Sequence, residues 1–468
     1  MKCSIVVFQN KGGQLNIGGV IVSSTDVLIV GGSAAGLTAA ISARRFNPEA
    51  KITLVRKEKR VLIPCGIPYI FGTLDSPEDD LIPDEVLTKH NIDLIVDEAT
   101  FINKGAKTLT TAGGDMINYE RMILATGSYP LVPPLPGVEL RNVFSAKKDI
   151  DYLTKLKQVL HQANDLVIVG GGFIGLEFAD ECRKIDNLNS VSIVEILPHC
   201  LLLACDSEVC MQVEEELKKA KVSLFNDRRA KAILGKKKVE QVELENGQKL
   251  KADIVILGIG VRPNIDLAMN AGLQVDDRTG IWVDSWMRTS DHNIFAAGDC
   301  TQKTCFLTRG ECVLRLASIA TMEARVAGAN LFSLRQRAAS PIGVFGTVIG
   351  DLSVGSAGFT ERQARKEGVE IIVGKATAAD KHPGTLPGAQ KLTVKLVFMK
   401  DSRKLIGGQV YGSDKAGYVA NCIGSLIQQG LRADELVTFQ VGTHPKLTPS
   451  PIAHQIENAA EIALAKLI

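Results

Sequence analysis

The sequence predicts an α/β fold with two strand–turn–helix units, followed by a separate α+β unit at the C-terminal end. A short β-branched run leads through a glycine-rich turn into a helix pattern at residues 26–43, and the same succession recurs at residues 165–179. Glycine accounts for 43 of the 468 residues, whereas aromatic residues make up only 5%. Many glycines with few aromatic side chains favour tight strand-to-helix turns over an all-β sandwich.

The composition is that of an ordinary globular protein of about three domains. Hydrophobic residues make up 45% and charged residues 23% of the chain, and 54 basic against 52 acidic side chains leave a net charge of +2. Such a balance provides no strong field for nucleic acid or an anionic lipid surface. No apolar run reaches the ~18 residues that a membrane span needs. We therefore expect neither nucleic acid nor a membrane span.

Residues 1–24 are predicted to be an N-terminal extension, and a hairpin is one form that it could take. Its two short apolar pieces, at residues 4–8 and 17–22, are separated and flanked by glycines. A signal peptide needs a continuous apolar stretch of about 7–15 residues and a cleavage site, and neither is clear.

The ten cysteines include no C-x-x-C pair. The sequence therefore indicates neither a zinc site nor a thioredoxin-type dithiol, and we expect no metal. Reduced packing thiols in a cytoplasmic protein are the preferred interpretation of most of them.

The first unit has the pattern of a dinucleotide-binding turn. The predicted strand at residues 26–30 runs into Gly31–Gly36, which reads G-x-G-x-x-G with Ser33 at the second glycine position. The pattern requires a tight turn at Gly31, close approach of a pyrophosphate near Ser33, and close helix–strand packing at Gly36. The helix that follows offers unpaired N–H groups and the positive end of its dipole to the phosphates.

The second unit repeats this pattern with glycine at all three positions, Gly170, Gly172 and Gly175. Its next predicted strand ends at Glu195, 20 residues after Gly175, which is the spacing of a carboxylate that binds the adenosine ribose. A carboxylate at this position repels a 2′-phosphate, so this turn should prefer NADH to NADPH. The first unit departs from the pattern, because Arg56 stands at the matching place and Glu58 is the nearest carboxylate.

Two further stretches, Ala125-Thr126-Gly127 after a strand at 121–124 and Gly298-Asp299 after a strand at 289–297, complete a joint pattern. Together with the two turns, they resemble the flavoproteins that have two dinucleotide-binding domains. The resemblance covers residues 25–468 and implies FAD in the first domain and NADH in the second. It implies an FAD domain at 25–146 and 269–335, an NAD domain at 147–268 and a dimerisation domain at 336–468. The implied FAD contacts are Gly31, Ser33, Ala34, Ala35, Gly36, Glu58, Cys65, Ala125, Thr126, Gly127 and Asp299. The implied NAD contacts are Gly170, Gly172, Phe173, Ile174, Gly175, Glu177, Glu195 and Gly260.

One cysteine stands in a motif of its own, Cys65-Gly66-Ile67-Pro68-Tyr69. Disulfide reductases of the glutathione or lipoamide type carry C-x-x-x-x-C here, but in this sequence Ile70 stands at the position of the second cysteine. The motif resembles the single-cysteine branch of the pyridine nucleotide–disulfide oxidoreductases, which contains coenzyme A disulfide reductases, NADH oxidases and peroxidases, and persulfide or polysulfide reductases. This resemblance implies a Cys65 thiolate that attacks sulfur, and we expect a helix N-terminus after Pro64 to lower its pKa.

The choice of electron acceptor is narrowed by positions at which this sequence lacks the catalytic residues of related enzymes. Ala34 occupies the place of a histidine in bacterial NADH oxidases and peroxidases, and neither residues 385–388 nor 442–445 contain the tyrosines of coenzyme A disulfide reductases. NADH-dependent reduction of persulfide, polysulfide or a coenzyme A-type disulfide therefore fits best. An NADH oxidase that reduces oxygen is the alternative, and a slow redox-sensing protein that binds FAD and NADH is a further one.

Three more residues carry open interpretations. His444-Pro445 resembles the His-Pro of glutathione reductase, whose histidine serves the partner subunit, but Pro449 stands where that motif has its glutamate. His444 is therefore either an acid–base catalyst or an interface residue. Arg44 and Arg45 end the first helix, where they either bind coenzyme A phosphates or complement the helix dipole. The resemblance implies a homodimer in which both chains build each active site, with small sulfur compounds and coenzyme A among its ligands.

Overall fold

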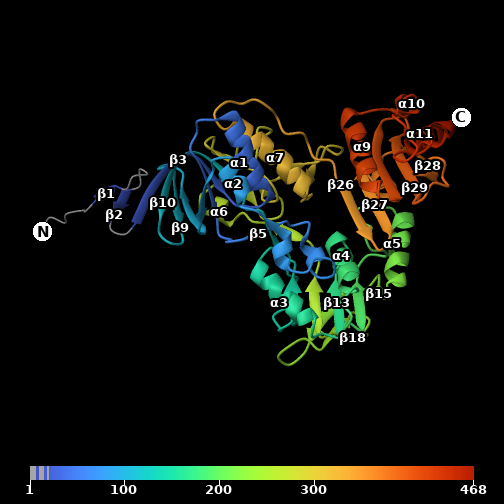
Figure 1. The fold of residues 1–468 in the computed structure, drawn as a ribbon, viewed down its shortest axis with the longest axis horizontal. Helices are drawn as coiled ribbons and strands as arrows, with labels where there is room; N and C mark the ends of the chain where they lie inside the picture. Colours follow the sequence, from blue (N-terminus) through green and yellow to red (C-terminus); the bar gives the residue numbers. More distant parts are fainter. Residues whose placement is uncertain (1–6, 10–14, 18–19, 468) are drawn as a thin grey trace.

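The computed structural model describes residues 7–9, 15–17 and 20–467 and confirms the predicted α/β fold in three units (Figure 1). The first unit contains a nine-stranded sheet, coloured mainly blue, and lies toward the N-terminus. The second unit, green, carries a five-stranded parallel sheet, and the third unit, red, ends the chain. Among the described residues, no helix has the length and apolar character needed to cross a bilayer.

The first sheet has a parallel core in which β10 (Met116–Leu124) and β4 (Ile52–Arg56) flank β3 (Val20–Val30). Strands β7 (Asp93–Val96) and β23 (Ile294–Ala296) extend this core beyond β4 and β10. Antiparallel strands continue it on the other half: β9 (Thr108–Thr111), β8 (Ala99–Asn103), β2 (Leu15–Ile17) and β1 (Val7–Gln9). Helices α1 (Ala34–Phe46) and α7 (Ala317–Asn330) pack side by side on this unit (Figure 1).

The N-terminal extension is partly described. Strands β1 and β2 pair antiparallel, and β2 pairs with the beginning of β3. The strand predicted at residues 26–30 is thus the second half of an eleven-residue strand, because the β-branched residues at 20–22 continue it toward the N-terminus. The rest of the extension lies outside the described residues.

The second sheet is fully parallel, in the order β12 (Val143–Ser145), β19 (Ile254–Leu257), β13 (Asp165–Val169), β14 (Ser190–Val194) and β15 (Val222–Phe225). Its helices are α3 (Ile150–Leu160), α4 (Phe173–Cys182) and α5 (Ser207–Lys219). Because β12 is hydrogen-bonded to β19, we propose that the second unit starts at residue 143 rather than at 147. The return of β23 to the first sheet supports our proposal that the second unit is an insertion.

The third unit is an antiparallel sheet of β26 (Val344–Ile349), β27 (Leu352–Gly358), β30 (Leu405–Gly412), β29 (Lys391–Met399) and β28 (Ile371–Ala379), in that order. Its helices are α8 (Glu361–Lys366), α9 (Ala416–Gln429), α10 (Ala433–Val437) and α11 (Gln455–Ala465). The prediction of an α+β unit at the C-terminal end is confirmed.

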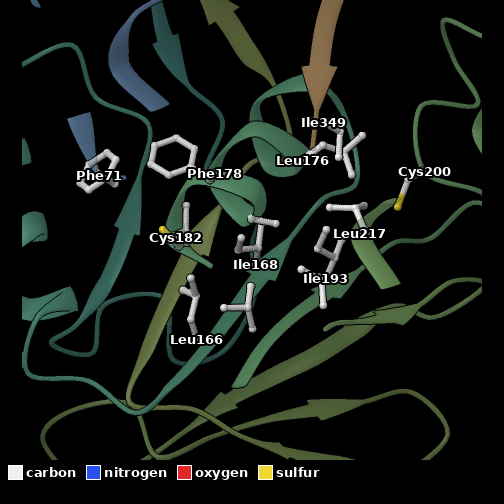
Figure 2. Packing of buried hydrophobic residues seen from close by; sticks show 14 of the residues in the cluster. Phe71, Leu166, Ile168, Leu176, Phe178, Cys182, Ile193, Cys200, Leu217 and Ile349 are labelled. Atoms are coloured by element: carbon white, nitrogen blue, oxygen red, sulfur yellow. The ribbon is translucent and has the colours of Figure 1, made fainter. Parts of the chain in front are cut away.

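One apolar cluster contains residues of all three units (Figure 2). Leu166, Ile168 and Ile193 of the second sheet pack beneath α4, whose Phe178 meets the ring of Phe71 at a centroid distance of 5.2 Å. Phe71 comes from the first unit, just after the Cys65 motif, and Ile349 comes from the third. Truncating a buried phenylalanine in such a core typically costs about 3–5 kcal/mol. The segment that follows Cys65 is therefore packed into the core of the second unit.

Candidate active site

The first glycine turn closes tightly around its own backbone. Gly31 has a φ of +112°, in the region that favours glycine. A methyl group at Gly31 would overlap the carbonyl oxygen of Ala125, and one at Gly36 would overlap that of Gly31. Ser33 precedes α1 in an extended conformation and its side chain does not cap the helix. The first N–H groups of α1, which begins with Ala34 and Ala35, therefore remain for an anionic ligand such as a pyrophosphate.

A cleft of ≈390 Å³ lies beside this turn, between the ends of β3 and β4, and Glu58 and Thr126 line it. Arg56 stands at the position of the expected acid. Its guanidinium is engaged by another residue, because it donates to both oxygens of Asp84 at 2.7 and 2.8 Å. The structure thus places Glu58 where a ribose hydroxyl could reach it.

The opposite wall of the first site comes from two strand ends. Gly127 has a φ of +71° with no atom near its missing side chain, and Thr126 Oγ1 donates to the carbonyl of Asn264 at 2.7 Å. Asp299 follows Gly298 and accepts a 2.8 Å hydrogen bond from Ser128 Oγ. Gly127 leaves open backbone, and Asp299 adds a carboxylate, which is the kind of lining that a long, hydroxyl-rich cofactor such as FAD needs.

A buried ion pair holds the Gly298 turn from behind. Lys303 Nζ lies 3.2 Å from Glu323 Oε1, and both side chains are almost fully buried. Glu323 accepts a 2.8 Å bond from the Gly298 N–H, and Lys303 donates to the Gly298 carbonyl at 2.8 Å. Burial raises the pKa of Glu323, while Lys303 opposes that rise. The sequence analysis missed both residues, because no local pattern connects them.

The second glycine turn repeats the geometry of the first. Gly170 has a φ of +111°, and a methyl group there would lie 2.6 Å from the Gly258 carbonyl oxygen. A methyl group at Gly175 would overlap the carbonyl oxygen of Gly170. Gly172, by contrast, precedes α4 and has no atom within 4 Å of the place that a methyl group would take. The turn therefore leaves room for a pyrophosphate at Gly172.

The remaining residues of the NAD prediction surround this turn. Phe173, the first residue of α4, stacks on Phe345 of the third unit at 5.2 Å, and Ile174 follows it. Gly260, beyond β19, has a φ of +106°. Phe173 thus connects the second nucleotide turn to the third unit.

Glu195 lies at the end of β14, as predicted, and is 7% exposed. Its Oε2 accepts from the Gly171 N–H at 2.6 Å, and its Oε1 accepts from the Leu197 N–H at 2.8 Å. The carboxylate is thus tied to the glycine turn itself. A dinucleotide ribose that binds this carboxylate must share it with two backbone donors.

Cys65 lies in a turn between β5 (Val61–Leu62) and the 3-10 helix η1 (Ile67–Ile70), and it is exposed. The predicted helix N-terminus is only this four-residue 3-10 turn. Pro68 stands in the first turn, where proline is tolerated, and the chain leaves the helical conformation in a turn at residues 71–75. The expected dipole support for the thiolate is therefore weak.

The surroundings of the thiol raise its pKa, which is opposite to the predicted lowering. Partial removal from water is the main cause, followed by the carboxylates of Glu177, Asp299 and Asp80, and Lys148 alone acts in the opposite direction. Lys148 also lies 3.5 Å from Asp299. Charges from the first and second units thus converge on one sulfur.

Helix α4 brings the second glycine turn and Cys65 together. Glu177, predicted as an NAD contact, acts electrostatically on Cys65 and accepts a 2.8 Å bond from Thr347 of the third unit. One turn later, buried Glu181 accepts from Thr73 at 2.8 Å, and a side chain on Gly72 would overlap the Glu181 carbonyl oxygen. A rigid helix therefore runs from the nucleotide turn to the cysteine segment.

The two arginines differ in their bonding. Arg44 donates to the carbonyls of His90, Pro48, Ala50 and Asn91 at 2.6–3.0 Å. These four bonds occupy most of the guanidinium donors of Arg44. Arg44 is therefore poorly placed to bind a phosphate. Arg45 is exposed on the following position.

His444 lies on the third unit, in the loop between α10 and the 3-10 helix η3 (Pro451–Ala453), and it is exposed. The imidazole Nδ1 of His444 accepts from the backbone N–H of Lys446 at 3.3 Å, and the backbone N–H of His444 donates to Thr448 Oγ1 at 3.0 Å. Cys65 lies on the first unit, and within the described part of the chain His444 is not among the groups that act on its thiol. Within the described ranges, no group of three or more metal-ligating side chains gathers.

Comparisons with known proteins agree with this architecture. Residues 25–324 match the family described as pyridine nucleotide-disulphide oxidoreductase, and residues 344–452 match its dimerisation domain. A relative from Methanocaldococcus jannaschii named NADH oxidase is 31% identical over 94% of this chain and 99% of its own. The NAD(P)H coenzyme A polysulfide/persulfide reductase of Pyrococcus horikoshii is 32% identical over 83% of this chain and 87% of its own.

Solved structures give the same result. A NAD-dependent persulfide reductase from A. fulgidus superposes with a TM-score of 0.88 at 29% identity, covering 94% of this chain and 83% of that one. The reduced CoADR-RHD protein of Bacillus anthracis superposes with a TM-score of 0.87 at 26% identity, covering 95% and 81%.

Proposed function

Because the chain belongs to the pyridine nucleotide-disulphide oxidoreductase family, we propose that its Cys65 reduces persulfide, polysulfide or coenzyme A-type disulfide sulfur with electrons from NADH. The protein is an FAD-dependent NAD(P)H oxidoreductase. The observation that carries the proposal is the exposed thiol of Cys65 in a segment packed against helix α4, which begins at the second glycine turn, with Asp299 of the first unit close enough to act on the same thiol. The names of its relatives from Pyrococcus horikoshii and A. fulgidus support a sulfur acceptor.

The residues of the chain have separable tasks in this reaction. The turn at Gly31–Gly36 and the lining at Thr126 and Asp299 would hold FAD, and the turn at Gly170–Gly175 would hold NADH. When bound, FAD supplies the transfer of two electrons from NADH to sulfur. The Cys65 thiolate attacks a substrate sulfur, so that a new S–S bond forms and the other sulfur leaves as an anion. Two electrons from NADH then break this new S–S bond, the attached substrate sulfur leaves as a second anion, and a proton returns Cys65 to its thiol form.

Oxygen is the competing acceptor, and the Methanocaldococcus jannaschii relative named NADH oxidase favours it. Ala34 in place of a histidine removes an acid–base group from that reaction. Anaerobic NADH oxidation with coenzyme A persulfide, polysulfide, coenzyme A disulfide and peroxide, beside an aerobic assay, decides between them. We expect the largest kcat/KM with persulfide or polysulfide. A larger value with oxygen would establish the oxidase, and slow turnover with every acceptor would favour the redox sensor.

We predict that the wild type prefers NADH to NADPH and that Glu195→Ala weakens this preference by about tenfold. The carboxylate repels a 2′-phosphate, and its removal also frees the Gly171 and Leu197 N–H groups that it now binds. The ratio of kcat/KM for NADH to that for NADPH measures the effect. A wild type that already favours NADPH would contradict the assignment of Glu195.

The match to the dimerisation domain supports a homodimer, and we propose that His444 of one chain serves Cys65 of the other. We expect His444→Ala to lower sulfur turnover by about 10²-fold, the usual contribution of a general acid, without slowing reduction of the bound flavin by NADH. An active species with the 50.3 kDa mass of one chain in size-exclusion chromatography would contradict the shared site. Full sulfur turnover in the variant would leave His444 as an interface residue.

A further inference from the structure

Asp80 is a buried carboxylate without a partner, fifteen positions beyond Cys65 in the chain. It ends the 3-10 helix η2 (Pro77–Asp80) and is 3% exposed. Its Oδ2 has no hydrogen-bond partner in the part of the chain that the structure describes. Buried polar atoms are nearly always hydrogen-bonded, and an unpaired charge is especially unfavourable. The buried, unpaired carboxylate of Asp80 therefore needs an explanation other than packing.

The carboxyl group of Asp80 packs against the residue next to Cys65. A methyl group on Gly66 would overlap Asp80 Oδ1 and would lie 2.7 Å from Asp80 Cγ. Gly66 has an ordinary φ of −84°, so its glycine serves this close approach rather than an unusual backbone conformation. The pairing of β5 with β6 (Leu81–Ile82) and a 2.8 Å bond from the Ile63 N–H to the Asp80 carbonyl fix the arrangement.

Charged neighbours do not neutralise Asp80. Arg60, the nearby cation, is engaged on the outer side of η2 by Glu78 and Asp151, at 3.1 and 3.2 Å. On the inner side the Asp80 carboxylate acts on the Cys65 thiol. Cys65 itself faces Glu177 from α4, Asp299 from the first unit and Lys148 from the segment before α3. Burial raises the pKa of Asp80 to about 6, so near neutral pH its charge is largely present and acts on the thiol.

We propose that Asp80 is a positioning residue for the Cys65 reaction: its buried charge beneath Gly66 opposes ionisation of the thiol and raises the pH at which the thiolate forms. The two acids titrate as a coupled pair, so a proton taken up by Asp80 makes loss of the proton from Cys65 easier. Cys65 thereby rests as a thiol, which is less prone to oxidation than a thiolate. The inference rests on the proposed function, because it concerns the same sulfur.

Alkylation of Cys65 tests the proposal without any sulfur substrate. FAD-loaded wild type, Asp80→Asn and the control Asp75→Asn, which changes an exposed carboxylate of the same segment, are treated with iodoacetamide from pH 6 to 10. Mass spectrometry of the Cys65 peptide gives each rate. We expect the midpoint of the Asp80→Asn profile to fall by about one pH unit, with alkylation near pH 8 up to about tenfold faster.

The outcomes separate this inference from the proposed function. Identical midpoints in Asp80→Asn and wild type, or an equal shift in Asp75→Asn, would overturn the role of Asp80 and leave sulfur reduction by Cys65 untouched. A Cys65→Ser variant that still reduces persulfide would overturn the function, whatever the alkylation profiles show.

Thermal unfolding provides a second measurement. Because folding raises the pKa of Asp80 from 3.8 to about 6, the carboxyl is protonated in both states well below pH 3.8 and costs nothing there. Between these values its ionisation favours the unfolded chain, so stability falls as pH rises, and the loss is complete above the folded-state pKa. The Tm advantage of Asp80→Asn over wild type should therefore grow from pH 4 to pH 7. A difference that does not change with pH would contradict the buried charge.

Discussion

Cys65→Ser is expected to lower persulfide and polysulfide reduction by about 10³-fold or more, the scale on which removal of a nucleophile acts. A serine hydroxyl stays protonated near neutral pH and forms no S–S bond. Most other described thiols, including Cys182, Cys200 and Cys300, are buried and cannot replace it. Reduction of bound FAD by NADH should survive, because the glycine turns and the Gly298–Asp299 lining remain.

Anaerobic stopped-flow measurements resolve the two halves of this prediction. Flavin bleaching by NADH reports the first half, and reoxidation by persulfide reports the second. Cys422→Ser, which changes a half-buried thiol of the third unit, is the matched control and should behave as wild type. Persulfide turnover that is undiminished in Cys65→Ser would place the chemistry on another residue.

Gly172→Ala is expected to lower kcat/KM for NADH by about 10²-fold, the effect of displacing a reactant by about 1 Å. Gly172 has an ordinary φ of −78° and no atom within 4 Å of the new methyl group. The variant should therefore fold and bind FAD normally. The methyl group would occupy the space through which the backbone approaches a pyrophosphate.

Two other glycines bracket this result. Gly105→Ala, an exposed turn residue with only a distant neighbour at 3.5 Å, should leave NADH turnover unchanged. Gly175→Ala should damage the second unit itself, because its methyl group overlaps the Gly170 carbonyl oxygen. Steady-state kinetics with thermal melts distinguish the cases. Wild-type NADH turnover in Gly172→Ala would move the coenzyme away from this turn.

Sequence reasoning succeeds where the physical cause is local. The two glycine turns are predictable because tight turns and close helix packing demand glycine within a six-residue window, and Gly31, Gly36, Gly170 and Gly175 show those overlaps. The single-cysteine motif is equally readable. The prediction of a helix after Pro64 fails because the length of a helix depends on the residues that follow it.

The charges around the sulfur could not be predicted in the same way. Asp80 and Lys148 reach Cys65 only after a short hairpin and a domain linker have folded, and Lys303 meets Glu323 across 20 positions of sequence. The sequence indicates Glu177 only as an NAD contact, because the direction of α4 toward the first unit is a tertiary property. A pattern in the sequence predicts the nucleophile, whereas only the fold shows which charges surround it.

The apolar cluster of Figure 2 restricts how the genes of such proteins can recombine. Domains joined only by linkers can be exchanged as whole modules during evolution or in the laboratory. In this protein Phe71 of the first unit and Ile349 of the third are buried in the core of the second. An exchanged second unit must therefore bring matching partners for both side chains. Coenzyme preference and sulfur chemistry are thereby inherited together. One core holds both helix α4, which follows the second glycine turn, and the segment that carries Cys65.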